Sequence, residues 1–349
     1  MLIYRQFVRP IFYFALKVLY ATRVLQALFR LREIYRPRLR VLMFHRVYGA
    51  RSVGLPAIGI SQENYSKLIE IVNNDLKTIS IEELMSDKIV SKGRVLITFD
   101  DAYQEIYEFA LPYLKRSELP AVIFPVIDGL YYQEQFWWDV VYAFLYYSEK
   151  YTVLPFQNEI SLPEQTRNKI NHILTKVSNE RGKEIYHLID EMKGYDRNLR
   201  QSISNIMADA YNKNLSHNGL LPRSIDLNTF KHQLCGQFSI GSHTVTHEFL
   251  NLVPSSEVIS ELSKSKRVLE EITKRKIISF AYPSGIYTSE ITDLVREAGY
   301  SFAFTTEHGA NHNADDSLRL RRININDDFV CDDYGHFSHA LTYWRLLKT

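Results

Sequence analysis

The segment Val95–Tyr103 reads VLITFDDAY, a short apolar run that is followed directly by two aspartates. A run of this length with no helical period is typical of a strand buried on both faces. Six further runs of the same kind are Val41–His45, Ala121–Val126, Phe238–Ile240, Ile277–Tyr282, Tyr300–Thr305 and Leu320–Ile325. Helical patterns lie between them at Ser61–Val72, Ala102–Lys115, Ser255–Lys274 and Ser289–Ala298, and Gly299 stands where a helix C-terminal cap is expected. Strands that alternate with helices predict an α/β fold with a parallel sheet or barrel.

The regular spacing of strands stops between residues 131 and 235. This stretch opens with the aromatic run YYQEQFWWDVVYAFLYY and continues as helical, polar text. We therefore predict three parts: a basic N-terminal helix at 1–36, a barrel formed by 37–130 and 236–349, and a mainly helical insertion at 131–235.

Composition excludes several classes of protein. The chain has 349 residues, 46% of them hydrophobic and 23% charged, which is typical of a folded globular protein. Its two cysteines, Cys235 and Cys331, exclude a disulfide-rich scaffold and a multi-cysteine metal cluster. Residues 1–40 carry nine Lys/Arg and one acid, so the net charge of +2 combines a basic head with a mildly acidic body, which is no nucleic-acid binder.

The basic head reads as an amphipathic helix. Between Arg9 and Arg23 the residues are apolar apart from Lys17 and Thr22, so the apolar run falls short of the roughly 20 residues of a spanning helix. On a helical wheel the cations gather on one side, and Phe12, Phe14, Leu16 and Leu19 lie on the other. We expect this helix to lie in a membrane interface. A helix packed on the protein body and a spanning anchor are the alternatives.

Two polar clusters follow predicted strands. Asp100 and Asp101 stand at the end of the first quoted run, and His243 and His247 follow the run that ends at Ile240. Side chains at the C-terminal ends of parallel strands point into the mouth of a barrel, where active sites are built. Histidines four apart share one face of a helical turn, and two imidazoles with one carboxylate form a catalytic metal site with open positions. The structural alternatives are helix N-capping by the aspartates and structural roles for the histidines. His308 and His312, equally spaced, read as part of a surface loop.

Three motifs in this order, TFDDAY, SHTVTH and FAYPSG, resemble the polysaccharide deacetylase family of metal-dependent amino-sugar N-deacetylases. The resemblance covers roughly residues 40–130 and 236–325. It implies a distorted (β/α) barrel of seven or eight strands. It also implies that Asp100 is the general base, that Asp101, His243 and His247 bind the metal, and that the backbone N–H of Ser284 stabilises the oxyanion.

Two features depart from the usual family pattern. VLMFHRV resembles members that carry the acid histidine on the first strand, so His45 is the candidate acid, with a structural strand-end histidine as the alternative. Ala281 stands where many relatives have an arginine that orients the base, and Arg321 or Arg322 is the candidate replacement. We further predict that Tyr282, Pro283, Arg322 and Trp138 contact the substrate, although an aromatic run such as Phe136–Trp138 is more often core.

The predicted function is metal-dependent hydrolysis of the N-acetyl group of an amino sugar in a bacterial cell-envelope glycan. The carrier is lipid-linked, as in a lipopolysaccharide precursor or a polyprenyl-phosphate sugar, or a polymer such as exopolysaccharide or peptidoglycan. Deformylation of a formylamino sugar and glycan binding without turnover are the alternatives. Zinc is the favoured metal, and cobalt, nickel or iron(II) suit the same ligands. The expected partners are this glycan or glycolipid and a membrane surface, with no nucleic acid and no nucleotide cofactor. We expect a peripheral protein of the bacterial inner membrane, with the cytoplasmic face slightly favoured.

Overall fold

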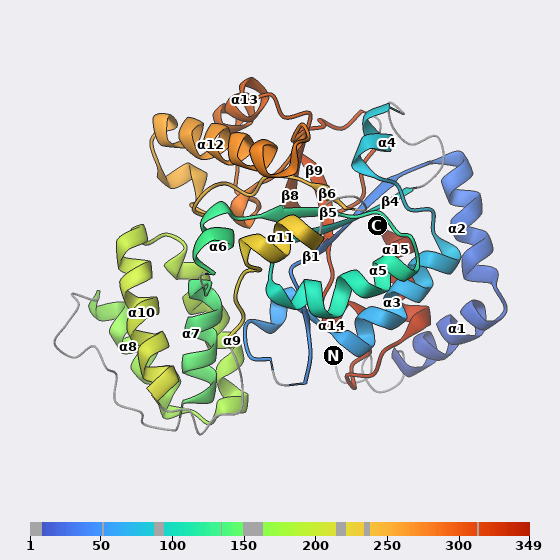
Figure 1. Cartoon of the computed structure of the whole chain (residues 1–349). Helices are drawn as coiled ribbons and strands as arrows, with labels where there is room; N and C mark the ends of the chain where they lie inside the picture. The colour runs from blue at the N-terminus through green and yellow to red at the C-terminus, as the bar shows by residue number, and fades with distance from the viewer. Residues whose placement is uncertain are drawn as a thin grey trace. The chain divides into compact units, whose positions relative to one another are not determined.

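The computed structural model describes residues 9–50, 52–86, 94–133, 135–148, 163–213, 221–233, 238–312 and 314–349. The chain forms two compact units (Figure 1). Unit 1 comprises residues 1–49, 56–132 and 225–349, and unit 2 comprises residues 50–55 and 133–224. Residues 225–235, which we assigned to the insertion, are therefore part of unit 1, as is the N-terminal head.

Unit 1 is built on seven parallel strands in the spatial order β6-β5-β4-β1-β9-β8-β7. The strands are β1 (Leu39–Phe44), β4 (Arg94–Asp101), β5 (Val122–Pro125), β6 (Ser239–Ile240), β7 (Ser279–Ala281), β8 (Phe302–His308) and β9 (Leu320–Asn324). Just after β6, Ser242 bridges Phe280 of β7, so the two edges of the sheet meet and the barrel is nearly closed. All seven predicted strands are present, and the predicted distorted (β/α) barrel is confirmed.

Gly241 allows this closure. A Cβ atom at this position would lie 2.1 Å from the ring of Phe124 and 2.6 Å from the Ser279 hydroxyl. Only a residue without a side chain permits β5, β6 and β7 to approach this closely.

The inside of the barrel is apolar at the end where the strands begin. Its core includes Val41, Leu96, Val122, Phe304 and Leu320. The segment of α4 (Ile81–Ser86) adds Ile81 and Leu84 to the same cluster, so this helix covers the beginning of the strands. The polar residues of the interior are therefore left at the opposite end.

The predicted helices of unit 1 are all present. They are α3 (Gln62–Asp75), α12 (Ser255–Thr273), α13 (Ser289–Glu297), and a π-helical turn at Ile106–Ala110 that continues into α5 (Leu111–Arg116). Gly299 has φ of 80°, and its N–H donates to the Arg296 carbonyl, as a C-terminal cap does. The other elements are β2 (Arg46–Tyr48), β3 (Gly59–Ser61), α6 (Ile127–Tyr132), α11 (Leu227–Gln233), α14 (Asp327–Val330) and α15 (His339–Lys348), with 3-10 turns at Pro56–Ile58, Leu250–Leu252 and Pro283–Gly285.

Unit 2 contains four helices among its described residues: α7 (Trp137–Tyr147), α8 (Glu164–Thr175), α9 (Ser178–Met192) and α10 (Arg197–Lys213). The buried Arg181 guanidinium donates to the carbonyl oxygens of Leu145 and Ser148, each at 2.7 Å. These bonds satisfy carbonyls at the end of α7 that have no partner within their own helix. Trp138 is only 8% exposed and stacks on Phe136, with ring centroids 4.7 Å apart. Its predicted contact with substrate stays a prediction.

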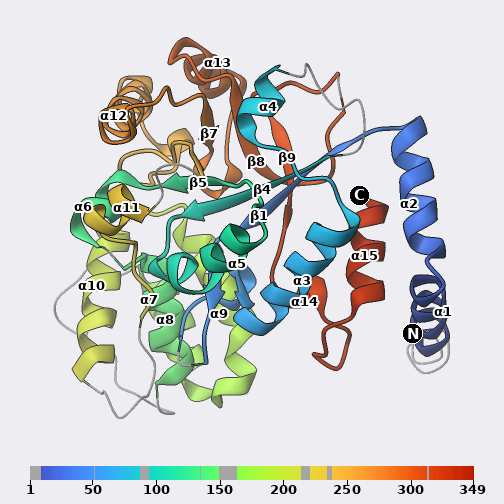
Figure 2. The same ribbon diagram turned by 45° about the vertical axis from the view of Figure 1, so that its right-hand side comes forward.

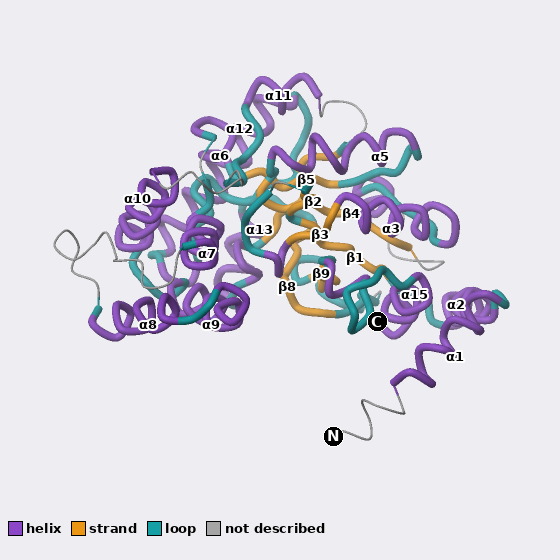
Figure 3. The backbone as a smooth tube through the Cα atoms, turned by 90° about the horizontal axis from the view of Figure 1, so that it is seen from below, coloured by secondary structure: helices purple, strands orange, loops and turns teal. Residues whose placement is uncertain are grey.

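The N-terminal head forms two helices instead of the expected one. α1 (Arg9–Ala21) and α2 (Val24–Tyr35) meet at Arg23, which has a left-handed backbone, and their axes differ by 76°. In the described part of the chain no single helix is long and apolar enough to cross a membrane, and this bent pair passes the same test only when taken together. Figures 2 and 3 show α15 beside the pair.

One face of each head helix packs on the rest of unit 1. Leu16, Leu25 and Phe29 are buried with Leu341 and Tyr343 of α15. Leu16 therefore faces the protein, which corrects its expected place on the outer apolar face.

Candidate functional site

A polar layer lies inside the barrel near the ends of the strands. Strand register places Met43 beside both Thr98 and Asn324, so residues at alternate positions of β4 and β9 share the inner face. Thr98 and Asp100 occupy this face on β4, and Arg322 occupies it on β9. All three are fully or almost fully buried.

Asp100 and Arg322 form a two-pronged ion pair. The Arg322 Nη1 atom lies 2.7 Å from one carboxylate oxygen of Asp100, and Nη2 lies 2.6 Å from the other. Arg322 Nε also donates to the Thr305 carbonyl at 2.8 Å, which fixes the plane of the guanidinium. Burial alone would raise the pKa of Asp100, but Arg322, together with His243 and His45, outweighs burial and holds that pKa well below its usual range.

Of the two arginines proposed to orient the base, the structure selects Arg322. Arg321 points the other way, is exposed, and lies 3.9 Å from Glu307. Because Arg322 is fully buried and committed to Asp100, the prediction that it contacts substrate is corrected to a positioning role.

Asp101, His243 and His247 converge beside this pair. The Asp101 Oδ1 atom lies 3.5 Å from Nε2 of each histidine, and one ligand atom from each residue falls within 4.8 Å of the other two. Asp101 has φ of 65°, so the backbone leaves strand geometry at this residue. Its side chain therefore does not follow the in-and-out alternation of the other β4 residues. The group has the donors and the spacing of a site for one divalent cation.

The two imidazoles are arranged as neutral ligands. His243 Nδ1 lies 2.8 Å from the Ala281 carbonyl, so this nitrogen carries the proton and Nε2 faces Asp101. Burial lowers the pKa of His243, and burial together with His243 lowers the pKa of His247 well below its ordinary value. Both rings therefore offer a lone pair at neutral pH.

The histidines meet through a loop and not through a helical turn, which corrects the reasoning from their spacing. No helix covers residues 243–247, and Thr244 and His247 have φ of 69° and 58°. Left-handed residues turn the chain so that His247 returns toward His243, and their ring centroids are 4.8 Å apart. The His247 N–H donates to the Thr244 hydroxyl at 3.0 Å, which closes the turn.

Glu261 of α12 supports this loop and was not predicted from the sequence. One of its carboxylate oxygens accepts from the N–H groups of Val245 and Thr246 at 2.7 and 3.1 Å, and the other accepts from the Thr246 hydroxyl at 2.9 Å. The only signal in the sequence is an acid on the buried stripe of a helix. Glu261 stands beside Val258 and Leu262 on the face that α12 buries.

His45, the candidate acid, lies at the end of β1. Its Nε2 atom is 3.8 Å from Asp100 Oδ2, and its side chain is 14% exposed. Burial lowers the pKa of His45 to about 4, although Asp100 opposes this shift. His45 is therefore neutral at pH 7 in the free site.

The segment after β7 makes a tight turn with unusual backbone angles. Ser284 has φ of 53° and Gly285 has φ of 71°, and the Ser284 carbonyl accepts from the Thr306 hydroxyl at 3.2 Å. A Cβ atom at Gly285 would lie 2.1 Å from that hydroxyl. Tyr282 and Pro283 are buried, and the Tyr282 hydroxyl donates to the Leu318 carbonyl at 3.0 Å. Their predicted contact with substrate stays a prediction.

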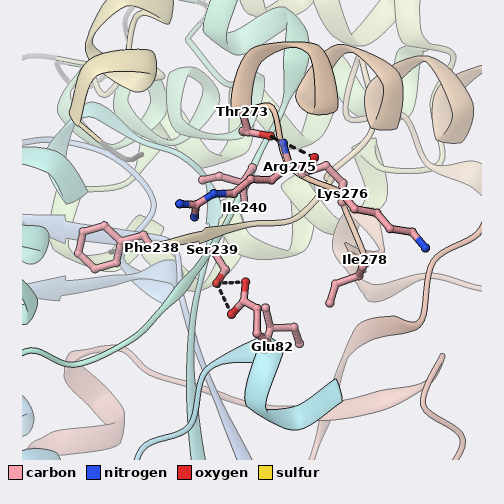
Figure 4. A pocket seen from close by; sticks show the side chains of 10 residues that line it. Glu82, Phe238, Ser239, Ile240, Thr273, Arg275, Lys276 and Ile278 are labelled. Atoms are coloured by element: carbon pink, nitrogen blue, oxygen red, sulfur yellow. Dashed lines mark hydrogen bonds between the residues drawn. The ribbon is translucent and has the colours of Figure 1, made fainter. Parts of the chain in front are cut away.

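Two other features lie outside this cluster. His308 and His312 are exposed, although His308 ends β8 and does not lie in the expected surface loop. A pocket at the beginnings of β6 and β7 contains none of the predicted site residues (Figure 4). It is lined by Ile81, Glu82, Phe238, Ser239, Ile240, Thr273, Arg275, Lys276, Ile277 and Ile278.

The fold and the site define an α/β-barrel protein with a candidate metal site beside a buried, ionised carboxylate. The sequence profile described as polysaccharide deacetylase matches residues 229–303. YxkH of Bacillus subtilis (strain 168), named for the same family, is 20% identical over 308 residues, covering 87% of this chain and 77% of that protein.

Two further relatives agree. A poly-β-1,6-N-acetyl-D-glucosamine N-deacetylase of Staphylococcus aureus (strain MSSA476) is 23% identical, covering 82% of this chain and 71% of its own. The crystal structure of BC0361, a polysaccharide deacetylase from Bacillus cereus, superposes with a TM-score of 0.51 at 17% identity, covering 90% and 70% of the two chains. The chain thus matches the polysaccharide deacetylase family over residues 229–303, and the curated relatives named for this activity are hydrolases of an amide C–N bond.

Proposed function

We propose that this protein uses a divalent metal ion to hydrolyse the N-acetyl group of an amino sugar in a bacterial cell-envelope glycan. One observation carries the proposal: the Asp101, His243 and His247 ligand atoms converge next to the Asp100–Arg322 pair and His45. A metal site beside an ionised carboxylate and a second proton-transfer group would support amide hydrolysis.

Asp101, His243 and His247 would hold the metal. Neutral imidazoles and a carboxylate suit zinc best, and cobalt, nickel and iron(II) accept the same ligands. When bound, a divalent ion polarises the acetyl carbonyl and makes water a stronger acid. The Ala281 carbonyl and Glu261 keep the two histidines in place for this task.

Asp100 would take the proton of the attacking water. Arg322 keeps its carboxylate ionised and fixes its direction. A proton taken up by Asp100 would then pass to His45 Nε2, which lies 3.8 Å from the Asp100 carboxylate. His45 would then deliver it to the departing sugar nitrogen. In this scheme, neutral His45 becomes the acid only during turnover.

Ser284 would supply the oxyanion donor through its backbone N–H. A fixed N–H group that faces a developing negative charge contributes typically 10²–10³ in kcat. The Thr306 hydroxyl donates to the Ser284 carbonyl and holds the turn in place. Thr306 can approach this closely because Gly285 has no side chain. The Ser284 peptide group therefore has one orientation before substrate binds.

The carrier of the sugar is proposed from two observations. The name of the Staphylococcus aureus relative identifies a polymer of N-acetylglucosamine as its substrate, which favours a glycan polymer here. The basic, apolar head favours a glycan joined to a lipid, such as a lipopolysaccharide precursor or a polyprenyl-phosphate sugar, for an enzyme held at a membrane. A formyl group in place of the acetyl group would undergo the same chemistry.

We place the protein at the surface of the bacterial inner membrane, with the cytoplasmic face favoured. The supporting observation is the charge of the head: nine basic and one acidic residue in the first 40. Such a segment is attracted to anionic lipids.

The function is tested by acetate release from acetylated amino-sugar oligomers and lipid-linked sugars, with and without a chelator. We expect release from at least one substrate, loss with chelator, and recovery when zinc is restored. Asp100→Asn should bind metal normally and release no acetate, whereas the exposed Asp190→Asn should behave as wild type. Formate release in place of acetate would identify a deformylase. Glycan binding that persists without turnover of any substrate by metal-loaded protein would identify a binding protein and reject the proposal.

A further inference from the structure

The two head helices carry a row of apolar side chains that points away from the protein. We call this the outer row. On both helices successive members are three or four residues apart, except for the adjacent Ile34 and Tyr35 at the end of α2. Its members are Ile11, Phe14, Val18, Val24, Leu28, Leu31, Ile34 and Tyr35, each between 39% and 80% exposed.

The outer row is fixed in place because the opposite faces of both helices are built into the fold. At about 100° per residue, Phe14 and Val18 lie roughly opposite Leu16 and Tyr20, which pack toward α15. On α2, Glu33 is buried and pairs with the fully buried Arg40 at 2.8 Å. Arg40 also donates to the Leu346 carbonyl and covers the ring of Phe29. The bent pair of helices α1 and α2 cannot turn its apolar residues inward without breaking these contacts.

Positive charge borders the outer row, and the acids beside it, Asp333 and Asp75, pair with Arg9 and Arg23. Lys17, Arg30 and Arg36 are exposed on these helices and on the residue that follows α2. Between residues 9 and 36 the sequence contains one acid, Glu33, and that acid is buried against Arg40. An apolar stripe bordered by cations complements an anionic lipid surface, where side chains such as Ile and Phe enter the acyl boundary and Lys and Arg reach the headgroups.

The lengths of the helices determine how they would meet a bilayer. α1 has 13 residues and α2 has 12, so each is about 20 Å long or less, against a hydrocarbon core of about 30 Å. The 76° bend between them prevents one straight span. An orientation in the plane of the interface exposes no backbone group to hydrocarbon, because both helices satisfy their own hydrogen bonds.

We propose that the bent pair α1–α2 lies flat in the headgroup region of an anionic bilayer and that the outer row inserts into the bilayer. This deepens the membrane location proposed above and rests on it. The docking surface is separate from the catalytic site: only residues 36–38 link α2 to β1, whereas His45 follows the other end of that strand, about 20 Å away. Lipid binding therefore holds the enzyme near its substrate without supplying catalytic groups.

The test uses full-length protein and sedimentation with two kinds of vesicle: phosphatidylethanolamine with 30% phosphatidylglycerol, and pure phosphatidylcholine. We expect binding to the anionic vesicles that weakens at high salt, and at least tenfold weaker binding to the neutral ones. The variant Ile11→Ser, Phe14→Ser, Val18→Ser and the variant Leu28→Gln, Leu31→Gln, Ile34→Gln should each weaken anionic binding at least tenfold. The matched control is Met85→Ser, Val177→Ser, Ile259→Ser, in which three apolar residues of similar exposure lie elsewhere, and it should bind as wild type.

Two further measurements separate the outcomes. Acetate release from a soluble acetylated oligomer should be unchanged in both outer-row variants, so loss of lipid binding is distinguished from misfolding and from failure of the proposed chemistry. Equal vesicle binding by wild type, variants and control would overturn the proposal. A wild-type dimer that becomes monomeric in the variants, with no vesicle binding by either, would assign the outer row to a second copy of this chain and would also overturn it.

Discussion

The Asp100–Arg322 pair makes a prediction that can be worked through from the structure. Arg322→Met removes the guanidinium and leaves a carboxylate that is 1% exposed. Removing one partner of a buried ion pair costs about 3–5 kcal/mol. If the ionised Asp100 carboxylate loses about 3 kcal/mol of stabilisation, its pKa rises by about two units. The pKa of Asp100 should therefore move up by this amount, from its present position well below the ordinary range.

The assay is kcat/KM for acetate release as a function of pH, at saturating metal. A base must be ionised to act, so kcat/KM should begin to fall at a higher pH in Arg322→Met than in wild type. Arg322→Lys should shift this fall less, because a positive charge remains without the two parallel bonds. The matched control is Arg321→Met, which removes the exposed neighbouring arginine and should leave the profile unchanged.

Stability gives an independent check. Arg322→Met should be less stable than wild type, and Asp100→Asn with Arg322→Met should recover part of the loss, since no charge is then left buried alone. An Arg322→Met enzyme with the wild-type acid limb and wild-type kcat/KM would refute the positioning role of Arg322. A double variant no more stable than Arg322→Met would refute the account of the pair.

Four further predictions follow. His45→Gln should lower kcat by about 10²–10⁴ while metal content, measured by elemental analysis, stays at the wild-type level; wild-type turnover would remove His45 from the proton path. Glu261→Ala should weaken metal binding by about 10–100-fold in a competition titration, and Glu261→Gln should restore part of the affinity. An unchanged affinity would show that the 243–247 loop keeps its conformation without Glu261. Gly285→Ala should lower kcat with metal retained, because a Cβ atom would lie 2.1 Å from a neighbouring hydroxyl, and undiminished kcat would argue against the oxyanion turn. Metal-free protein should lose stability in urea melts as pH falls from 7 toward 4. Burial lowers the pKa of His45, His243 and His247 in the folded state, so the unfolded chain takes up protons first. A stability that is constant or rises as pH falls would contradict the neutral state of these histidines.

The strands were the part of the fold most open to prediction. Parallel strands are buried on both faces, so each is a continuous apolar run, and VLITF or AVIFPV leaves little choice of structure. The head was harder, because PIFYFALKVLYAT is apolar nearly all round. Local pattern does not say which apolar side meets α15. Leu16 was predicted on the same face as Phe14, although at about 100° per residue the two side chains lie about 200° apart.

The candidate site divides in the same way. Asp100 and Asp101 end a recognisable strand, and His243 and His247 belong to a short motif after another strand, so the sequence drew attention to all four before the structure brought them together. Glu261 and the choice of Arg322 over Arg321 were not predictable. Glu261 acts across 15 and 16 residues of intervening chain, and the two arginines differ only in which face of β9 they occupy.

The sequence by itself determined the order of strands and helices, the three motifs and the basic charge of the head, since these depend on residues near one another in the chain. The tertiary structure decided which arginine meets Asp100, how a loop with left-handed residues brings His247 back to His243, and which side of the head faces solvent. These depend on contacts such as Arg322 with Asp100, 222 residues apart, and on the burial that such contacts create. Burial is also what sets the pKa of His45, so even the protonation state of a predicted residue was settled only by the folded chain.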